Sequence, residues 1–480
     1  MHAVEEFNRY IASLCERLGH ADRHAGLSGY CTGLMLPLSR KSVEPMAARL
    51  DPLHVSARHQ ALHHFVAQSE WSDRAVRAAV RDWVQPVLGL EQGCYWIVDD
   101  TGFAKKGRHS VGVARQYCGQ LGKQDNCQVA VSVSLASARG SLPVAYQLYL
   151  PQDWADDGAR RAAAGVPEEL AFATKPAIAL AQLSQAVHEG GPPGVVLADA
   201  GYGDETAFRD GITALGLPYA VGIRPGTTVW APGTAPLPPK AWSGRGAKPV
   251  RPRRAPGHEP VTVKALALSL SESHWHTAQW REGTQGEPLS GRFAAVRVRP
   301  AHRDTHLTEM RAPEWLLIEW PAGQPEPVKY FLSTAPPDAT LEQMVFVTKM
   351  RWRIERDYQE LKQDFGLGHY EGRGWRGFHH HATLSIAAYA FLMAQRLELS
   401  QMDPTPQSNS DEAAEGKKIS QRPVPAVPAD HIPRGRPACP APRHRLDQDI
   451  APAPECRSGA NPRTLPALRH NESEINVVTQ

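Results

Sequence analysis

Two kinds of stabilising or anchoring feature are missing from the sequence. Its seven cysteines are scattered, odd in number and free of any C-x-x-C pair, which argues against a zinc site or a disulfide framework. No apolar run reaches the roughly 20 residues that span a membrane, and the N-terminus lacks the apolar region of a secretory signal. We therefore expect a protein of the reducing cytoplasm with no membrane partner.

A strong charge of either sign is also missing. The formal net charge of +3 and the pI of about 8.4 permit nucleic-acid binding without indicating it, so local clusters must carry that argument. Apolar residues make up 42% of the chain, which suits a globular protein with a sizeable core. A length of 480 residues fits two or three domains.

The last 80 residues lack aromatic side chains altogether and hold 13 prolines. Such a composition cannot bury enough apolar surface to offset the entropy of ordering. We expect a disordered, Pro-rich tail over residues 400–480. One hypothesis is that this tail is a frameshifted terminus that replaced a natural helical ending.

The chain before this tail divides into a helical part and an α/β part. Apolar periodicity predicts helices in residues 1–90, including 55–68 and 72–84. Many arginines there indicate either solvated helix faces or a helical N-terminal DNA-binding region. The α/β part, from residue 95 to residue 223, consists of short apolar runs that predict strands, with two predicted helices among them. The predicted strands are 95–98, 110–117, 126–136, 142–149, 195–198 and 219–223, and the predicted helices are 174–187 and 205–215.

This order of elements predicts an α/β protein with an RNase H-like catalytic core. Its first part would cover 91–224, and its helical part, with a third acid, would cover 336–399. Between them, residues 225–335 are rich in Pro, Gly and β-branched residues and predict an inserted β-rich subdomain. A basic run in this segment indicates either a loop that touches phosphates or a solvated linker. Its cations are Lys240, Arg245, Lys248, Arg251, Arg253, Arg254 and Lys264, against the single acid Glu259.

Three acidic positions are candidates for one metal site. Asp99 or Asp100 follows the apolar run 95–98, Asp199 follows 195–198, and Glu355 lies on a predicted helix over 340–365. Thr340 and Gln343 predict a capping box at the start of that helix. Mg²⁺ prefers oxygen ligands, and two such ions about 3.5–4 Å apart can clamp the attacking and leaving oxygens of a phosphodiester.

These motifs together resemble the DDE transposases of bacterial insertion sequences, in the IS701-like branch of the IS4-type group. The resemblance covers about residues 5–397. It rests on the segments Val98–Gly107, Ser110–Gly119, Leu150–Trp154, Ala198–Gly203 and Arg351–Glu355. It implies a nucleoid-associated bacterial transposase that uses two Mg²⁺ ions, replaceable by Mn²⁺. It further implies cleavage at insertion-sequence ends, 3′-OH strand transfer into target DNA, and a homodimer on double-stranded DNA.

The resemblance also assigns the site residues. Asp99, Asp199 and Glu355 would be the catalytic metal ligands, with Asp100 as the alternative first acid, because neighbouring residues of a strand face opposite sides. The family spacing of Tyr, Arg, Glu and Lys lands on Thr348, Arg351, Glu355 and Lys362, so a threonine replaces the tyrosine. The expected DNA contacts are Arg351, Trp352, Lys362, Lys105, Lys106, Arg115, Arg253 and Arg254. Trp352 is either a base-stacking residue or a core residue.

Other interpretations remain open at this level. A nuclease of the same fold would hydrolyse DNA without joining it, and a catalytically inactive, transposase-derived protein would only bind DNA. A G-x-G-x-x-G occurs from Gly372 to Gly377, but it follows a helix, so dinucleotide binding is not expected. The adjacent histidines His379–His381 diverge by about 100° each on a helix, so we expect a helix start there rather than a metal site.

Overall fold

The structure is a computed structural model that describes residues 2–283 and 286–402. The described residues all belong to one compact unit. The expected disordered tail therefore falls outside the described residues, except at its start. The last helix continues to Met402, so it extends beyond the predicted end at about 397.

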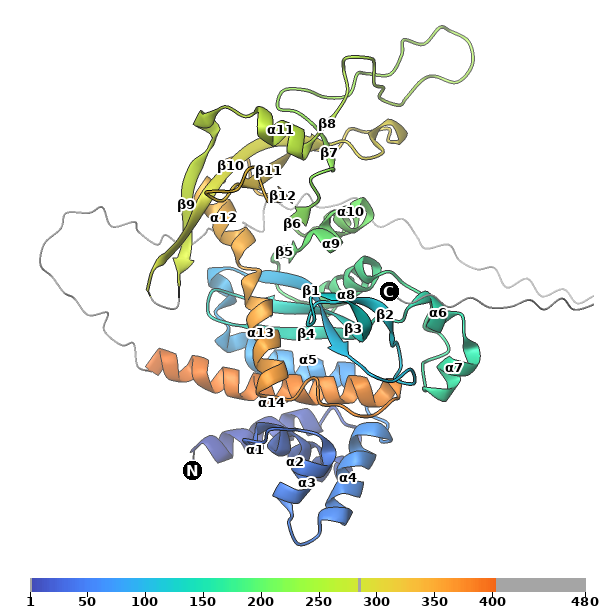
Figure 1. Cartoon of the computed structure of the whole chain (residues 1–480), viewed down its shortest axis with the longest axis vertical. Helices are drawn as coiled ribbons and strands as arrows, with labels where there is room; N and C mark the ends of the chain where they lie inside the picture. Colours follow the sequence, from blue (N-terminus) through green and yellow to red (C-terminus); the bar gives the residue numbers. More distant parts are fainter. Residues whose placement is uncertain (1, 284–285, 403–480) are drawn as a thin grey trace, which may run out of the picture. The chain divides into compact units, whose positions relative to one another are not determined.

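The N-terminal region is helical, as predicted. Its helices are α1 (His2–Cys15), α2 (His24–Met35), α3 (Val43–Leu50), α4 (Val55–Ala67) and α5 (Asp73–Val84). Ser72 caps α5 by accepting a hydrogen bond from the Ala75 amide. Helices α1–α4 lie on the side of the long helix α14 (Trp375–Met402) that faces away from the sheet, whereas α5 packs against both α14 and β4 (Figure 1). The Tyr10 hydroxyl, for example, donates to the Ala387 carbonyl at 2.8 Å.

Strands of the described residues form one mixed sheet. In chain order they are β1 (Tyr95–Ala104), β2 (Ala114–Cys118), β3 (Lys123–Ala136), β4 (Ser141–Leu148), β5 (Val195–Ala198), β6 (Tyr219–Ile223), β7 (Thr228–Trp230), β8 (Val261–Thr262), β9 (His276–Glu282), β10 (Pro288–Pro300), β11 (Glu314–Glu319) and β12 (Lys329–Ser333). The spatial order is β2-β3-β1-β5-β6-β12-β11-β10-β7-β8, with β4 beside β3 and β9 beside β10. β1, β5 and β6 are parallel, whereas β3 runs antiparallel to β1. The prediction of a mixed α/β fold is confirmed.

Two predicted strands differ from the observed ones. β1 continues through Asp99 and Asp100 to Ala104, so both acids lie inside the strand and not after its end. The cause is tertiary, because β3 pairs with every residue of β1, from Tyr95↔Ala136 to Ala104↔Cys127. β2 begins only at Ala114, four residues later than predicted.

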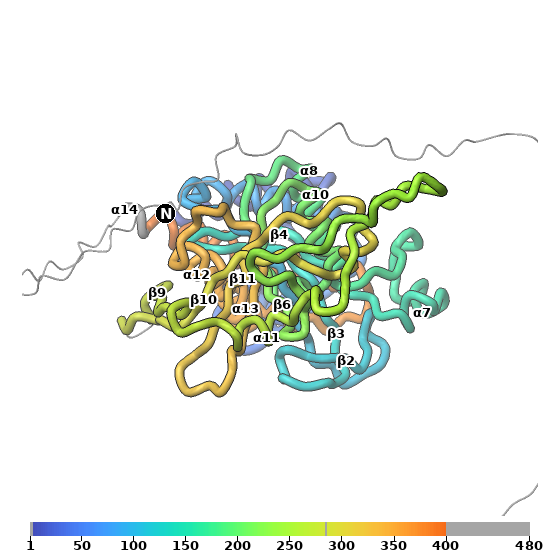
Figure 2. Tube along the Cα trace, turned by 90° about the horizontal axis from the view of Figure 1, so that it is seen from above, coloured from blue at the N-terminus to red at the C-terminus, as the bar shows by residue number. Residues whose placement is uncertain are grey.

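The remaining helices connect or cover these strands. They are α6 (Gln152–Ala155), α7 (Gly158–Ala163), α8 (Lys175–His188), α9 (Ala200–Gly203), α10 (Thr206–Ala214), α11 (Val263–Ser269), α12 (Leu341–Lys349) and α13 (Trp352–Gln363). Short 3₁₀ turns are η1 (Ala21–Arg23), η2 (Gln85–Val87), η3 (Leu90–Gln92), η4 (Glu272–His274) and η5 (Asp304–His306). β12 pairs with β6, so the strands of the 225–335 segment continue the sheet that contains β1 and β5. Figure 2 shows these elements from a second direction.

The single helix predicted over 340–365 is two helices. The capping box of Thr340 and Gln343 is present at the start of α12. The chain then leaves the helix at Met350 and Arg351, and α13 starts at Trp352. Met350 is buried and Arg351 turns toward the sheet, where it pairs with an acid of β1. Two tertiary contacts thus override a local sequence that favours one continuous helix.

The three adjacent histidines lie in the second turn of α14, and each is buried. His380 contacts the carbonyls of Val66 and Trp71, at 3.0 and 2.9 Å. His381 contacts the Gly366 carbonyl and the Tyr30 hydroxyl, both at 2.9 Å. They therefore join α14 to the N-terminal helices. No cluster of potential metal ligands occurs in residues 2–283 and 286–402.

We predict that these histidines make the fold acid-sensitive. Burial lowers the pKa values of His380 and His381 to about 4, whereas an unfolded histidine has a pKa of about 6.5. Below pH 6.5 the unfolded chain binds protons that the folded chain does not, so the free energy of unfolding falls by up to about 3 kcal/mol per histidine as the pH approaches 4.

Urea unfolding between pH 7.5 and 4.5 measures this effect. The His380→Gln variant should show a shallower loss of stability with falling pH than the wild type, because one proton-linked group has been removed. Equal pH slopes for the two proteins would contradict the prediction.

Candidate functional site

Two carboxylates are aligned by neighbouring parallel strands. β1 pairs with β5 in the register Tyr95↔Val195, Trp96↔Val196 and Ile97↔Leu197. Asp99 lies two residues after Ile97, and Asp199 lies two residues after Leu197. Continued by two residues, this register puts Asp199, just after the end of β5, at the position equivalent to Asp99 on β1, and neighbouring strands lie about 4.8 Å apart. Asp199 is also the N-cap of α9, where its carboxylate accepts the Gly201 amide at 2.8 Å.

Asp99 and Asp100 point to opposite faces of the sheet. Asp100 faces α8, because its carboxylate pairs with Lys175 at 3.0 Å and accepts a hydrogen bond from the Tyr202 hydroxyl at 3.3 Å. Asp99 faces α13, because its carboxylate pairs with Arg351 at 2.7 Å. Of the two candidate first acids, Asp99 is therefore the one on the face that carries Glu355.

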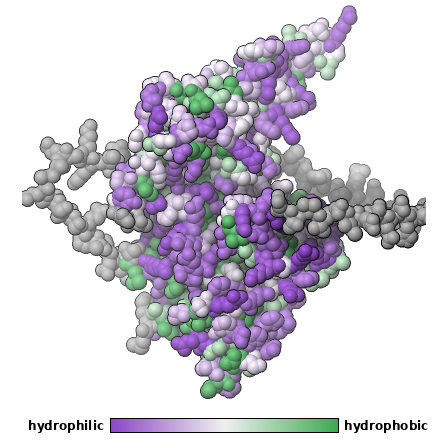
Figure 3. Space-filling view, viewed as in Figure 1, coloured by the Kyte–Doolittle hydropathy of each residue, from purple (hydrophilic) through white to green (hydrophobic). Residues whose placement is uncertain are grey.

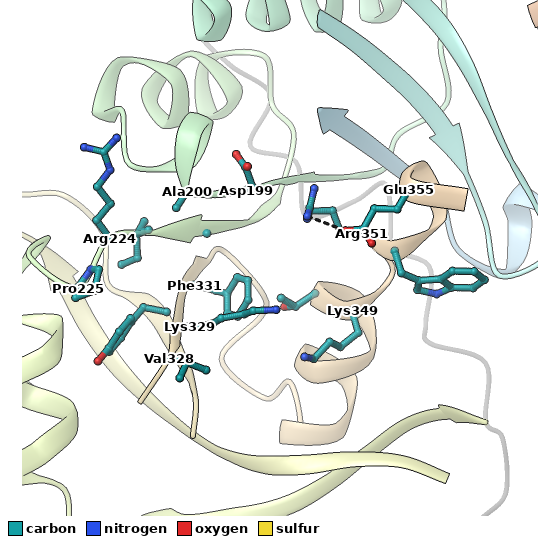
Figure 4. Close-up of a pocket in the computed structure, with 15 residues that line it drawn as sticks. Asp199, Ala200, Arg224, Pro225, Val328, Lys329, Phe331, Lys349, Arg351 and Glu355 are labelled. Carbon is teal, nitrogen blue, oxygen red and sulfur yellow. Dashed lines mark hydrogen bonds and ion pairs between the residues drawn. The ribbon is translucent and has the colours of Figure 1, made fainter. Parts of the chain in front are cut away.

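Arg351 connects the first and third candidate acids. One guanidinium nitrogen lies 2.7 Å from Asp99 and another lies 3.0 Å from Glu355. The side chain of Glu355 is 63% exposed and that of Asp99 is 18% exposed. Figure 4 shows Asp199 on one side of the pocket and the ion-paired Arg351 and Glu355 of α13 on another. The break between α12 and α13 places Arg351 at this point.

Burial and like charge both act on Asp99. Burial raises the pKa of Asp99 to about 6, the Arg351 guanidinium opposes that rise, and the charge of Asp199 adds to it. The pKa of Arg351 is raised by Asp99, Glu355 and Asp199 against the opposing effect of its own burial. The site thus concentrates negative charge that one guanidinium balances.

Two of the three acids, Asp199 and Glu355, border a pocket of about 490 Å³ between the sheet and α12–α13, and Asp99 does not line it. Its wall combines Asp199 and Glu355 with basic side chains on the other elements. The basic residues are Arg224, Lys329, Lys349 and Arg351. Thr348 also lines the pocket, is buried, and its hydroxyl has no hydrogen-bond partner among the described residues. Thr348, at the position for which the resemblance implies a tyrosine, thus has a buried hydroxyl that no described residue satisfies.

Two of the three candidate acids, Asp99 and Asp199, are placed so that they could bind a hard divalent cation. Asp99 and Asp199 are in-register carboxylates that repel each other, and such a pair favours a shared cation with oxygen ligands. As placed, no three acidic, histidine or cysteine side chains of the described residues are grouped closely enough to hold a metal ion. Glu355 is linked to Asp99 through Arg351, whose guanidinium pairs with both carboxylates.

The expected DNA contacts divide into engaged and exposed side chains. The Lys362 ammonium donates to the Gly102 carbonyl at 2.9 Å and lies over the Phe103 ring. Lys105 donates to the Tyr370 carbonyl at 3.2 Å. Arg254 pairs with Asp304 at 2.7 Å. The exposed members are Lys106, Arg115 and Arg253.

Trp352 lies between two guanidinium groups. Arg281 and Arg353 have their charged carbons 4.6 and 4.7 Å from its ring centroid. It is only partly buried and borders the pocket. Arg281 belongs to β9, so this stack joins the 225–335 segment to α13.

Two other acids of α13 have partners of their own. Glu360 pairs with Arg356 and Arg396, both at 2.9 Å. Asp357 is buried and accepts hydrogen bonds from Ser141 and Tyr389, at 2.6 and 3.0 Å. Neither lines the pocket, so Glu355 is the acid of α13 that does.

Sequence reasoning missed the basic wall of the pocket. Arg224 follows β6, Lys329 begins β12 and Lys349 ends α12, and none of the three belongs to a motif. Lys349 also pairs with Glu319 at 2.7 Å and lies over the Trp280 ring. A lone lysine on a strand or helix is ordinarily a solvated residue, so no local pattern could identify these three.

Comparison with known proteins agrees with this geometry. A family model described as DDE superfamily endonuclease matches residues 13–287, more than half of the chain. The chain belongs to the DDE superfamily endonucleases. The match contains Asp99 and Asp199 and ends before Glu355.

One known transposase is similar to part of the chain. The chain is 32% identical over 193 residues to a "Probable transposase for insertion sequence element IS701" from Microchaete diplosiphon, over 40% of this chain and 47% of the relative. It thus spans about half the length of that curated relative. The likeness to an IS701 transposase therefore applies to that part of the chain. Within its described residues, no helix has both the length and the apolar character needed to cross a membrane.

Proposed function

We propose that this DDE endonuclease is a transposase that cleaves the ends of an insertion sequence and joins the freed 3′-OH to target DNA. The observation that carries the proposal is the in-register pair Asp99 and Asp199, on the sheet face from which Arg351 reaches Glu355. The pocket beside them combines acids with a basic wall, which suits a phosphodiester held next to a cation site.

Asp99, Asp199 and Glu355 would hold two Mg²⁺ ions, for which Mn²⁺ can substitute. Such ions activate the attacking oxygen and neutralise the leaving oxygen of an in-line displacement. Lys329, Lys349 and Arg224 would bind the phosphates of the strand in the pocket. The Thr348 hydroxyl would donate to a phosphate oxygen, in place of the family's tyrosine.

The same proposal includes the domain organisation, the DNA-binding residues and the oligomeric state. The sheet β3-β1-β5-β6 with α8 and α13 is the RNase H-like core, in two parts at 91–224 and 336–399. Residues 225–335 are its inserted β-rich subdomain. Residues 1–90 bind DNA, together with Arg351, Trp352, Lys362, Lys105, Lys106, Arg115, Arg253 and Arg254. A homodimer holds two element ends on the bacterial nucleoid.

Strand transfer with purified protein tests the proposal and separates its alternatives. Pre-cut element ends, a supercoiled target plasmid and Mg²⁺ should give joined products. Nicked or cut DNA without joining would indicate a nuclease that only hydrolyses. Binding of the ends without either reaction would indicate an inactive DNA-binding protein, and replacing residues 400–480 with the ending of an active relative would then show whether the tail is the cause.

A further inference from the structure

A basic arm projects from the sheet between β7 and β8. Fourteen consecutive residues, Pro238–Arg251, are all exposed, and the segment extends away from the strands in two views (Figures 1 and 2). Hydrophilic residues dominate this projection (Figure 3). Burial of apolar surface therefore does not hold this part of the arm in place.

Charge is the distinctive property of this arm. Residues 231–258 contain six lysines and arginines and no carboxylate. Four cations lie on the exposed part, and none of them forms an ion pair within the described residues. These four are Lys240, Arg245, Lys248 and Arg251. Unpaired cations on one projection repel each other, so the arm is more stable when polyanionic phosphates lie beside it.

The arm is anchored at its base and stiffened along its length. Arg254 donates to Asp304 and to the Ala301 carbonyl, both at 2.7 Å, and Asp304 also accepts from Trp230 of β7 at 2.6 Å. An isolated bridge joins Leu237 to Arg253. Eight prolines in residues 231–260 restrict the backbone, which lowers the entropy lost on binding. Arg254, expected from sequence to contact DNA, is thus the anchor.

The tip is held by a side chain that remains exposed. The Trp242 indole donates to the Gly246 carbonyl at 3.2 Å across a turn in which Gly244 and Gly246 have φ angles of 84° and 72°. Trp242 is nevertheless 54% exposed. An aromatic ring among unpaired cations is typical of surfaces that bind nucleic acid.

We propose that this arm, Pro238–Arg251, binds the phosphate backbone of duplex DNA without regard to sequence. This inference rests on the proposed function. The arm would be a second DNA contact, adjacent in the chain to residues that line the pocket. Arg224 and Pro225 line the pocket, and β7 leads from them directly into the arm. The arm would hold DNA that continues beyond the reacting strand.

The salt dependence of binding tests the arm. A variant with all four exposed arm cations changed to Gln is compared with the wild type for binding an unrelated 40-base-pair duplex in EDTA, with fluorescence anisotropy over a range of NaCl concentrations. Each phosphate contact contributes about −0.9 to the slope of log K against log salt, so four lost contacts make the slope shallower by about 3.6. An unchanged slope would overturn the proposal.

A matched control removes four positive charges from residues that each form an ion pair with a carboxylate. It changes four paired surface cations to Gln and should leave the slope as in the wild type. These are Lys264, Arg292, Arg376 and Arg396. An equal drop in this control would overturn the proposal, because net charge alone would then explain the effect.

A smaller variant guards against misfolding. If the fourfold arm variant fails to fold, the Arg245→Gln/Lys248→Gln double variant should still lower the slope by about 1.8. Because binding is measured in EDTA, the arm is tested apart from the chemistry. Wild-type protein that binds through the arm but yields no joined DNA would refute the transposase proposal alone.

Discussion

Strand transfer by the Asp99→Asn, Asp199→Asn and Glu355→Gln variants is expected to fall at least about a thousandfold, which corresponds to about 4 kcal/mol of transition-state stabilisation. An amide has the size of the carboxyl group but carries no negative charge, so it is a weaker ligand for a hard cation. Joined products on gels, quantified over time with Mg²⁺ and with Mn²⁺, measure the effect. Binding of element ends in EDTA should persist in all three variants.

Two neutral substitutions serve as matched controls. Asp100→Asn removes a charge next to Asp99 but on the α8 face, where Lys175 and Tyr202 are its partners. Glu360→Gln removes a charge on α13 that pairs with Arg356 and Arg396. Both variants should retain strand transfer. An inactive Asp100→Asn together with an active Asp99→Asn would show that the first acid has been assigned to the wrong residue.

The Arg351→Met variant should be less stable than the wild type in EDTA and should bind Mg²⁺ more tightly. Removing one partner of a largely buried ion pair costs about 2–4 kcal/mol, and here it leaves Asp99 beside Asp199 with no balancing cation. Since the guanidinium and a metal ion compete for Asp99 and Glu355, we expect the Kd for Mg²⁺ to fall about tenfold, or about 1.4 kcal/mol.

Chemical unfolding in EDTA and titration calorimetry with Mg²⁺ measure the two effects. Both are carried out at pH 8, above the raised pKa of about 6 of Asp99. Arg356→Met is the control, because Arg356 pairs with Glu360 on the same helix but away from the pocket. If Arg351→Met binds Mg²⁺ as the wild type does, Arg351 is not a competitor for the cation.

The stack around Trp352 shows why sequence left its role open. Helical periodicity placed a tryptophan beside Arg351, and both core packing and base stacking were consistent with that position. Arg281, which lies 71 residues earlier, occupies one face of the ring in the folded chain. Only the pairing of β9 and β10 brings this arginine to α13, so no local pattern could have revealed it.

Much of the site was nevertheless predictable from sequence. Apolar runs identified β5 and β6 to the residue, and the capping box identified the start of α12. These features depend on side-chain periodicity and on hydrogen bonds within a few residues. Strand alternation predicted that Asp99 and Asp100 face opposite sides of the sheet, whereas the choice of Asp99 rested on the resemblance.

The sequence by itself determined the elements that carry Asp99, Asp199 and Glu355, because each lies on or next to a segment with a strong local pattern. The tertiary structure decided how those elements meet. The parallel register of β1 and β5 sets the two aspartates side by side, and the break at Met350 and Arg351 turns a helix residue onto β1. Neither is encoded locally, since strand register and helix interruption depend on packing between residues more than 90 positions apart.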